Sequence, residues 1–169
     1  MRMPQVATYA TLLVSLVLSA CAGPWGTTIT PGEPTTSVVQ RLGPPTAVHL
    51  LPDGGRRLEY WGGTYGLQTL MVETDAQGRV LGAENVRDEA HFNRIQPGIT
   101  REQLRQQLGA PSWVWRVRYH DQTVWSYRFY GPFCLVFHVG ITPQGVVEDT
   151  SYGPDPACEE PFLFRRGDR

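Results

Sequence analysis

The stretch IQPGITREQLRQQLGAP, residues 95–111, decides the fold. Thr100 followed three residues later by Gln103 has the spacing of a capping box, in which the first residue caps a helix and the second bonds back to it. Leu104 and Leu108 are four residues apart, so they lie on one face of that helix. The stretch therefore predicts a short amphipathic helix with one apolar stripe.

The end of this helix is also encoded, and the same signals occur earlier in the chain. A glycine just after the last apolar residue and a proline two positions later are typical of a helix end. The segment LGAP (108–111) matches LGPP (42–45), and IQPG (95–98) matches ITPG (29–32), in both cases 66 residues apart. A constant separation between turn residues indicates a duplicated structural unit.

Strand-like segments follow each predicted helix. Short loops separate consecutive segments, which indicates antiparallel hairpins. In the second copy, alternate apolar residues from Leu135 to Ile141 predict one face that packs on the helices. The predicted strands are residues 47–51, 56–61, 67–74 and 80–86 in the first copy, and 113–119, 123–130, 134–141 and 146–152 in the second.

These elements predict an α+β fold of two tandem units. The first unit, residues 29–87, reads as one helix and four strands. The second, residues 88–153, reads as two helices and four strands because residues 88–94 predict an extra short helix. Residues 154–169 are left as a C-terminal tail.

The N-terminus predicts export. Arg2, an apolar run over residues 10–18 and the small residues before Cys21 are arranged as in a cleaved secretory signal, here residues 1–20. The sequence LSAC (18–21) resembles the bacterial lipobox, which implies that Cys21 is lipidated and palmitate-bearing. Residues 21–28 then form a tether, and the resemblance, with Ala22 after the cysteine, implies an outer-membrane lipoprotein that faces the periplasm.

The two remaining cysteines predict a disulfide. Cys134 and Cys158 form an even pair in a chain expected to be exported, where disulfides persist. Neither has a histidine or another cysteine at metal-ligand spacing. A structural bridge between them is therefore expected.

The residues quoted above, together with a Trp-x-Tyr strand, resemble the BamE (SmpA/OmlA) family of small outer-membrane lipoproteins. Tandem copies of such a unit also resemble the β-lactamase-inhibitor-protein-like fold, which implies one extended sheet. The family resemblance implies a non-catalytic protein-binding or scaffold role in the cell envelope, linked to assembly of β-barrel outer-membrane proteins. The second resemblance implies an alternative, a periplasmic enzyme inhibitor. The residues that best carry the first are Pro97, Gly98, Thr100, Leu108, Gly109, Pro111, Trp125 and Tyr127.

No motif for catalysis stands out. The sequence has no Ser/His/Asp signature, no His-x-x-x-His pair and no glycine-rich phosphate loop. The formal net charge is −1, so no basic field favours nucleic acid. We expect no enzyme, no metal and no cofactor, and the expected partners are the membrane, through Cys21, and another envelope protein.

Aromatic residues crowd the first hairpin of the second copy and are the candidate partner-binding residues. Strand alternation predicts that Trp125 and Tyr127 share a buried face, with Ser126 outside. The 66-residue repeat instead aligns Trp125 with Glu59, which favours an exposed Trp125, so both a core and a binding patch stay open. The candidates are Trp113, Trp115, Tyr119, Trp125, Tyr127 and Tyr130.

Overall fold

A computed structural model describes residues 28–63 and 66–158. The predicted signal, the lipidation site Cys21 and residues 159–169 of the predicted tail lie outside these residues. The fold is α+β, with mostly antiparallel sheets and a few short helices. No helix in the described part combines the length and apolar character that crossing a membrane requires.

The first unit is one helix on one sheet. Helix α1 (Thr35–Leu42) precedes strands β1 (Ala47–Leu50), β2 (Arg56–Gly62), β3 (Gln68–Thr74) and β4 (Val80–Asn85). The strands pair antiparallel in the order β1-β2-β3-β4. Val38 of α1 is fully buried against one face of this sheet, and the cluster there consists of Val38, Leu58, Tyr60, Leu70, Val72 and Val80.

The second unit has two helices on one sheet. Helices α2 (Glu89–Phe92) and α3 (Arg101–Leu108) precede β5 (Trp113–Val117), β6 (Gln122–Arg128), β7 (Leu135–Ile141) and β8 (Val147–Pro154), which pair antiparallel in that order. The capping box at Thr100 and Gln103 is present, as predicted. The helices bury an apolar cluster of Phe92, Ile95, Leu104, Leu108, Tyr127, Phe129, Phe137, Val139, Ile141 and Val147.

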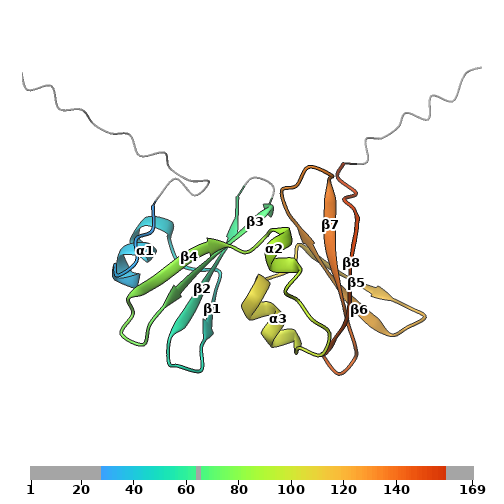
Figure 1. Ribbon diagram of the computed structural model, residues 1–169, viewed down its shortest axis with the longest axis horizontal. Helices are drawn as coiled ribbons and strands as arrows, with labels where there is room; N and C mark the ends of the chain where they lie inside the picture. Colours follow the sequence, from blue (N-terminus) through green and yellow to red (C-terminus); the bar gives the residue numbers. More distant parts are fainter. Residues whose placement is uncertain (1–27, 64–65, 159–169) are drawn as a thin grey trace, which may run out of the picture.

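The prediction of one extended sheet is not confirmed. The strands form two separate four-stranded sheets, and α2 and α3 lie between them (Figure 1). Strands β4 and β5 do not pair because the helical segment that joins them occupies the space between the sheets. The layers are therefore α1, the first sheet, α2 with α3, and the second sheet.

The two units share equivalent contacts, but the register between them differs from the predicted one. Tyr60 and Tyr127, 67 residues apart, each donate a hydrogen bond to the glycine carbonyl that follows the preceding helix, that of Gly43 (3.3 Å) or Gly109 (3.4 Å). The predicted alignment of Glu59 with Trp125 is therefore wrong by one residue. The reason is that the β5–β6 hairpin is one residue longer than β1–β2, since Leu50 pairs with Arg56 but Arg116 pairs with Thr123.

Candidate functional site

The two sheets differ in what covers the face opposite their own helix. In the first sheet this face bears Glu59, Thr69 and Met71, and each is at most 1 % exposed. The cover is the C-terminal end of α3 and the turn after it. Ala110 N–H donates to Glu59 Oε1 (2.8 Å), and Arg57 donates to the Gln106 carbonyl (3.0 Å). We call this set of contacts the joint between the units.

Arg87 is the central cation of the joint. Its guanidinium donates to Thr69 Oγ1 (2.9 Å), to Ser112 Oγ (2.9 Å) and to the carbonyl of Ala110, and it lies 5.0 Å from the centroid of the Tyr127 ring. Burial lowers the pKa of Arg87 to about 10, so the side chain stays protonated at neutral pH. A buried cation is tolerated here because its N–H groups have acceptors.

The equivalent face of the second sheet is covered by no element of the described chain. We call it the open face. Residues directly opposite one another on paired strands point to the same side, so the pairing register defines its members. They are Trp113, Trp115, Val117, Gln122, Val124, Ser126, Arg128, Val136, His138, Gly140, Asp149, Ser151 and Gly153.

Two tryptophans and one histidine dominate the open face, and we call them the indole–imidazole cluster. The ring centroid of His138 lies 6.4 Å from that of Trp113 and 6.2 Å from that of Trp115, with edge-on geometry in both cases. These rings lie over strand residues that are almost fully buried, such as Ser126 and Val136. Trp115 itself remains 45 % exposed. The aromatic side chains thus occupy the place that α3 takes on the first sheet, and they form the outer surface.

A hydrogen-bond chain fixes the cluster. Trp115 Nε1–H donates to Ser126 Oγ (3.1 Å), which lies 2.9 Å from His138 Nδ1. Ser126 is fully buried and has no other acceptor among the described residues, so its hydroxyl donates to Nδ1 and His138 carries its proton on Nε2. Burial lowers the pKa of His138, which favours this neutral ring.

The contact between Ser126 and His138 is not a catalytic dyad. A nucleophilic serine must present its oxygen to substrate, whereas Ser126 is 0 % exposed and already accepts a hydrogen bond from Trp115. Within residues 28–63 and 66–158, no group of three or more metal-ligating side chains is placed to hold an ion. The arrangement is suited to binding through ring surfaces.

A disulfide supports one end of the open face. Cys134 and Cys158 are bonded, as predicted, with Cα atoms 6.3 Å apart. Asp155 N–H, in the same loop, donates to the Cys134 carbonyl (2.9 Å), and the Asp155 carboxylate accepts from Arg128 at 2.7 Å. Arg128 in turn lies 5.4 Å from the ring centroid of Trp113. The disulfide therefore helps to position the Arg128–Asp155 ion pair, whose guanidinium contacts the ring of Trp113.

The structure separates the six predicted aromatic candidates. Tyr127 is fully buried beneath the helices, on the buried face that strand alternation predicts, so of the two interpretations left open the core holds for this residue. Trp125 packs partly against the same core, since it points to the helix side with Tyr127. Trp113 and Trp115 lie on the open face. Tyr119 and Tyr130 are 97 % and 85 % exposed, in the loops before and after β6, and make no ring contact with the cluster.

Three participants were not predicted from the sequence. Ser126 was expected outside, yet the indoles bury it, and Arg128 was not singled out. No role for His138 follows from the sequence pattern. The signal that would have found them is register, because Trp113, Ser126 and His138 stand directly opposite one another on adjacent strands.

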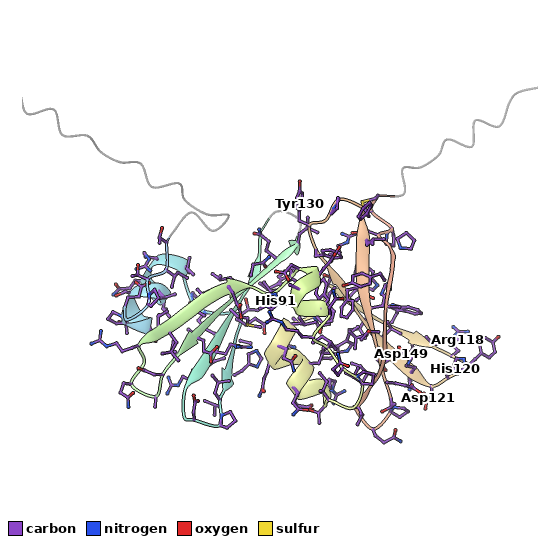
Figure 2. The ribbon with its side chains drawn as sticks, viewed as in Figure 1. His91, Arg118, His120, Asp121, Tyr130 and Asp149 are labelled. Carbon is purple, nitrogen blue, oxygen red and sulfur yellow. A yellow bond between two sulfur atoms is a disulfide. The ribbon has the colours of Figure 1, made fainter. Side chains whose placement is uncertain are left out.

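The acidic end of the open face lies beside the β5–β6 hairpin. Gln122 Nε2 donates to Glu148 Oε2 (3.1 Å) and lies 3.3 Å from Asp149 Oδ2, so two carboxylates converge on one amide. Figure 2 places Asp149 near the hairpin tip that carries Arg118 and His120. Neither Glu148 nor Asp149 forms an ion pair within the described residues.

Comparisons with known proteins do not assign a family. No protein-family model matches the chain, and no curated protein matches it. The likeness to solved structures includes the DUF4309 family protein YjgB of Bacillus subtilis, at 16 % identity over 73 % of this chain and 79 % of that one, with a TM-score of 0.29.

Two further solved structures are similar at the same level. One is a proposed beta-lactamase inhibitor protein of Streptococcus mutans, at 11 % identity, with 73 % of this chain and 84 % of that one covered and a TM-score of 0.31. The other is an extracellular protein of Bacillus anthracis that contains an SCP domain, at 9 % identity, with 74 % and 44 % covered and a TM-score of 0.29. TM-scores this low do not establish a shared fold, so the BamE-like resemblance stays a prediction.

Proposed function

We propose that this protein is a non-catalytic envelope lipoprotein that binds another protein through the open face of its second sheet. One observation carries the proposal. In the first unit this sheet face is buried under a helix, whereas in the second unit the indole–imidazole cluster forms its exposed surface. Exposed aromatic side chains in a fixed arrangement are typical of interaction hot spots.

The replacement of residues between the two faces supports a change of partner. Glu59 and Met71 at the joint correspond to Ser126 and His138 on the open face, at a shift of 67 residues. The carboxylate that binds the turn after α3 has thus been exchanged for a hydroxyl under an indole. The open face is therefore chemically unsuited to a second copy of that helix and turn.

The anchor belongs to the same proposal. Lipidation at Cys21 would hold the body at the periplasmic side of the outer membrane. The partner there that the BamE resemblance favours is the β-barrel assembly machinery. Several acyl chains on one cysteine are sufficient for stable anchoring. Incorporation of labelled palmitate into the wild type and its loss in Cys21→Ser tests the anchor independently of the partner.

Site-specific photo-crosslinking in intact cells tests the binding face. A photoreactive residue at Ser151, exposed on the open face, should capture one partner, and Trp115→Ala in the same chain should abolish the product. The matched control is the same residue at Gln40, exposed on α1, which should capture none. Equal products from both positions, or none from Ser151, would remove the proposal. Capture of a partner outside the β-barrel assembly machinery would remove only that link.

The inhibitor alternative ranks second because the loop that would enter a target's cleft is bonded to itself. Asp53, at the tip of the β1–β2 hairpin, accepts a hydrogen bond from Gly55 N–H through Oδ1 (2.9 Å), as in an ordinary tight turn. Inhibition of a panel of β-lactamases and lysozymes by the purified protein would reverse this order.

A further inference from the structure

We propose that the indole–imidazole cluster recognises a proline-rich segment of the partner, bound as a polyproline II helix with a basic residue directed to Glu148 and Asp149. This inference rests on the proposed function, since it names the chemistry of the segment that the open face binds. It depends on three observations: the ring surfaces, the hydrogen-bond groups that the cluster leaves available, and the unpaired acidic end.

The cluster offers ring surfaces and hydrogen-bond donors. His138 presents Nε2–H, because Nδ1 accepts from Ser126. Trp113 Nε1–H forms no hydrogen bond with the described residues, whereas Trp115 Nε1–H is taken by Ser126. The Ser126 Oγ atom that contacts Trp115 and His138 is buried beneath the cluster, so it is not available to a ligand. At its centre, the open face therefore favours a ligand that supplies carbonyl acceptors and apolar rings.

A proline-rich segment supplies those groups and lacks backbone donors. Each proline has a carbonyl and a pyrrolidine ring but no N–H, so it needs no acceptor from the protein. The polyproline II helix forms no internal hydrogen bonds and is already extended, which lowers the entropy lost on binding to aromatic surfaces. Its rise of about 3.1 Å per residue spans two residues in about 6.2 Å. This is close to the spacing of about 6.7 Å between alternate strand residues such as Trp113 and Trp115.

The acidic end gives the segment a direction. Asp149 pairs with Gly140, two residues beyond His138 on β7, so the carboxylates begin roughly 7 Å from the cluster along the strand. Glu148 and Asp149 both point at Gln122 and have no cation among the described residues. An arginine or lysine at one end of a proline-rich segment would complement this charge.

Fluorescence anisotropy of labelled peptides tests the inference with the mature full-length protein. The probes are decaproline, decaproline followed by two arginines, a glycine–serine decapeptide followed by two arginines, and a labelled chito-oligosaccharide. We expect the second probe to bind tightest. Trp115→Ala should weaken its binding by at least about tenfold, as expected for a central aromatic residue of an interface. Asp149→Asn should remove its advantage over decaproline.

The control variant is Tyr119→Ala, which removes an almost fully exposed aromatic ring from the hairpin tip and should leave every affinity unchanged. Equal binding of the glycine–serine and proline probes would overturn the polyproline II assignment, as would binding of the oligosaccharide alone. If Ser151 still captures a partner while no proline probe binds, this inference is wrong and the proposed function stands. If neither is seen, both are wrong.

Discussion

The first and second sheets have the same strand order, yet different groups cover the face opposite their own helices. The first sheet buries Glu59 and Thr69 under α3, together with Arg87 from the segment after β4. The second sheet covers Ser126 and Val136 with its own tryptophans. In a tandem pair of such units, the helices of the second unit cover the outer face of the first sheet, but no third unit among the described residues covers the outer face of the second sheet. That open face is therefore available to bind another molecule.

Removal of the buried cation should break the joint and give the largest effect. We expect Arg87→Met to lower the free energy of unfolding by about 3–5 kcal/mol, because removal of the buried guanidinium leaves the buried oxygens of Thr69, Ser112 and Ala110 without their donor. Urea unfolding of the two proteins measures the difference. Arg118→Met, on the exposed hairpin tip, is the control and should change little. Equal effects of the two substitutions would show that Arg87 does not hold the units together.

Loss of the disulfide should affect the second unit and its open face. The bridge spans 24 residues, so Cys134→Ser with Cys158→Ser should cost roughly 3 kcal/mol of stability. Because the loop holds Asp155 against Arg128, the near-ultraviolet circular dichroism of the tryptophans should also weaken. A reductant should reproduce both changes in the wild type and cause none in the double variant. An unchanged tryptophan signal would disconnect the bridge from the open face.

The equivalent helices of the two units, α1 and α3, differ in how their first turn is capped, and this difference should be measurable. Helix α3 has the Thr100 capping box, whereas the N-cap residue of α1 is Pro34, which provides no side-chain cap. We expect Thr100→Ala to destabilise the protein by about 1 kcal/mol, the usual value of a helix cap. Thermal unfolding measures this change, and Thr36→Ala on the exposed side of α1 should have a smaller effect. If both substitutions cost the same, the cap is not what distinguishes the helices.

A smaller effect on stability is expected from a change in pH. It tests the consequence of having His138 in the second unit at the position that Met71 occupies in the first. Burial holds the pKa of His138 below its ordinary value, so the unfolded chain binds this proton more readily than the folded one. Stability should therefore fall as pH drops below about 6.5, the ordinary histidine pKa. His138→Met, which restores the first unit's residue, should flatten this part of the profile. His120→Gln, on the exposed tip, should not.

A substitution on the open face should weaken partner binding with little change in stability. Trp115 is nearly half exposed, so Trp115→Phe should be well tolerated in the fold while it removes the donor to Ser126 and loosens the cluster. We expect weaker photo-crosslinking from Ser151 and an unfolding free energy within about 1 kcal/mol of wild type. A variant that binds normally would exclude the hydrogen-bond chain from recognition.

Local sequence signals were sufficient for the elements and their ends. Thr100 with Gln103 set the start of α3, and the glycines at 43 and 109 set the helix ends, because capping depends on residues within one turn. The disulfide between Cys134 and Cys158 followed from cysteine count and the expected export. Alternation along β7 identified which residues face the helices.

The sequence by itself determined the pattern of two helix-and-sheet units, their hairpins and one bridge, since each follows from neighbouring residues, from the internal repeat or from the cysteine count. Only the tertiary structure decided that Glu59 is fully buried at the joint and that Ser126 lies beneath Trp115. Alternation assigns a side chain to a face but does not say what covers that face. The cover comes from residues far apart in the chain, such as Glu59 and Ala110, whose contact depends on how the two units pack.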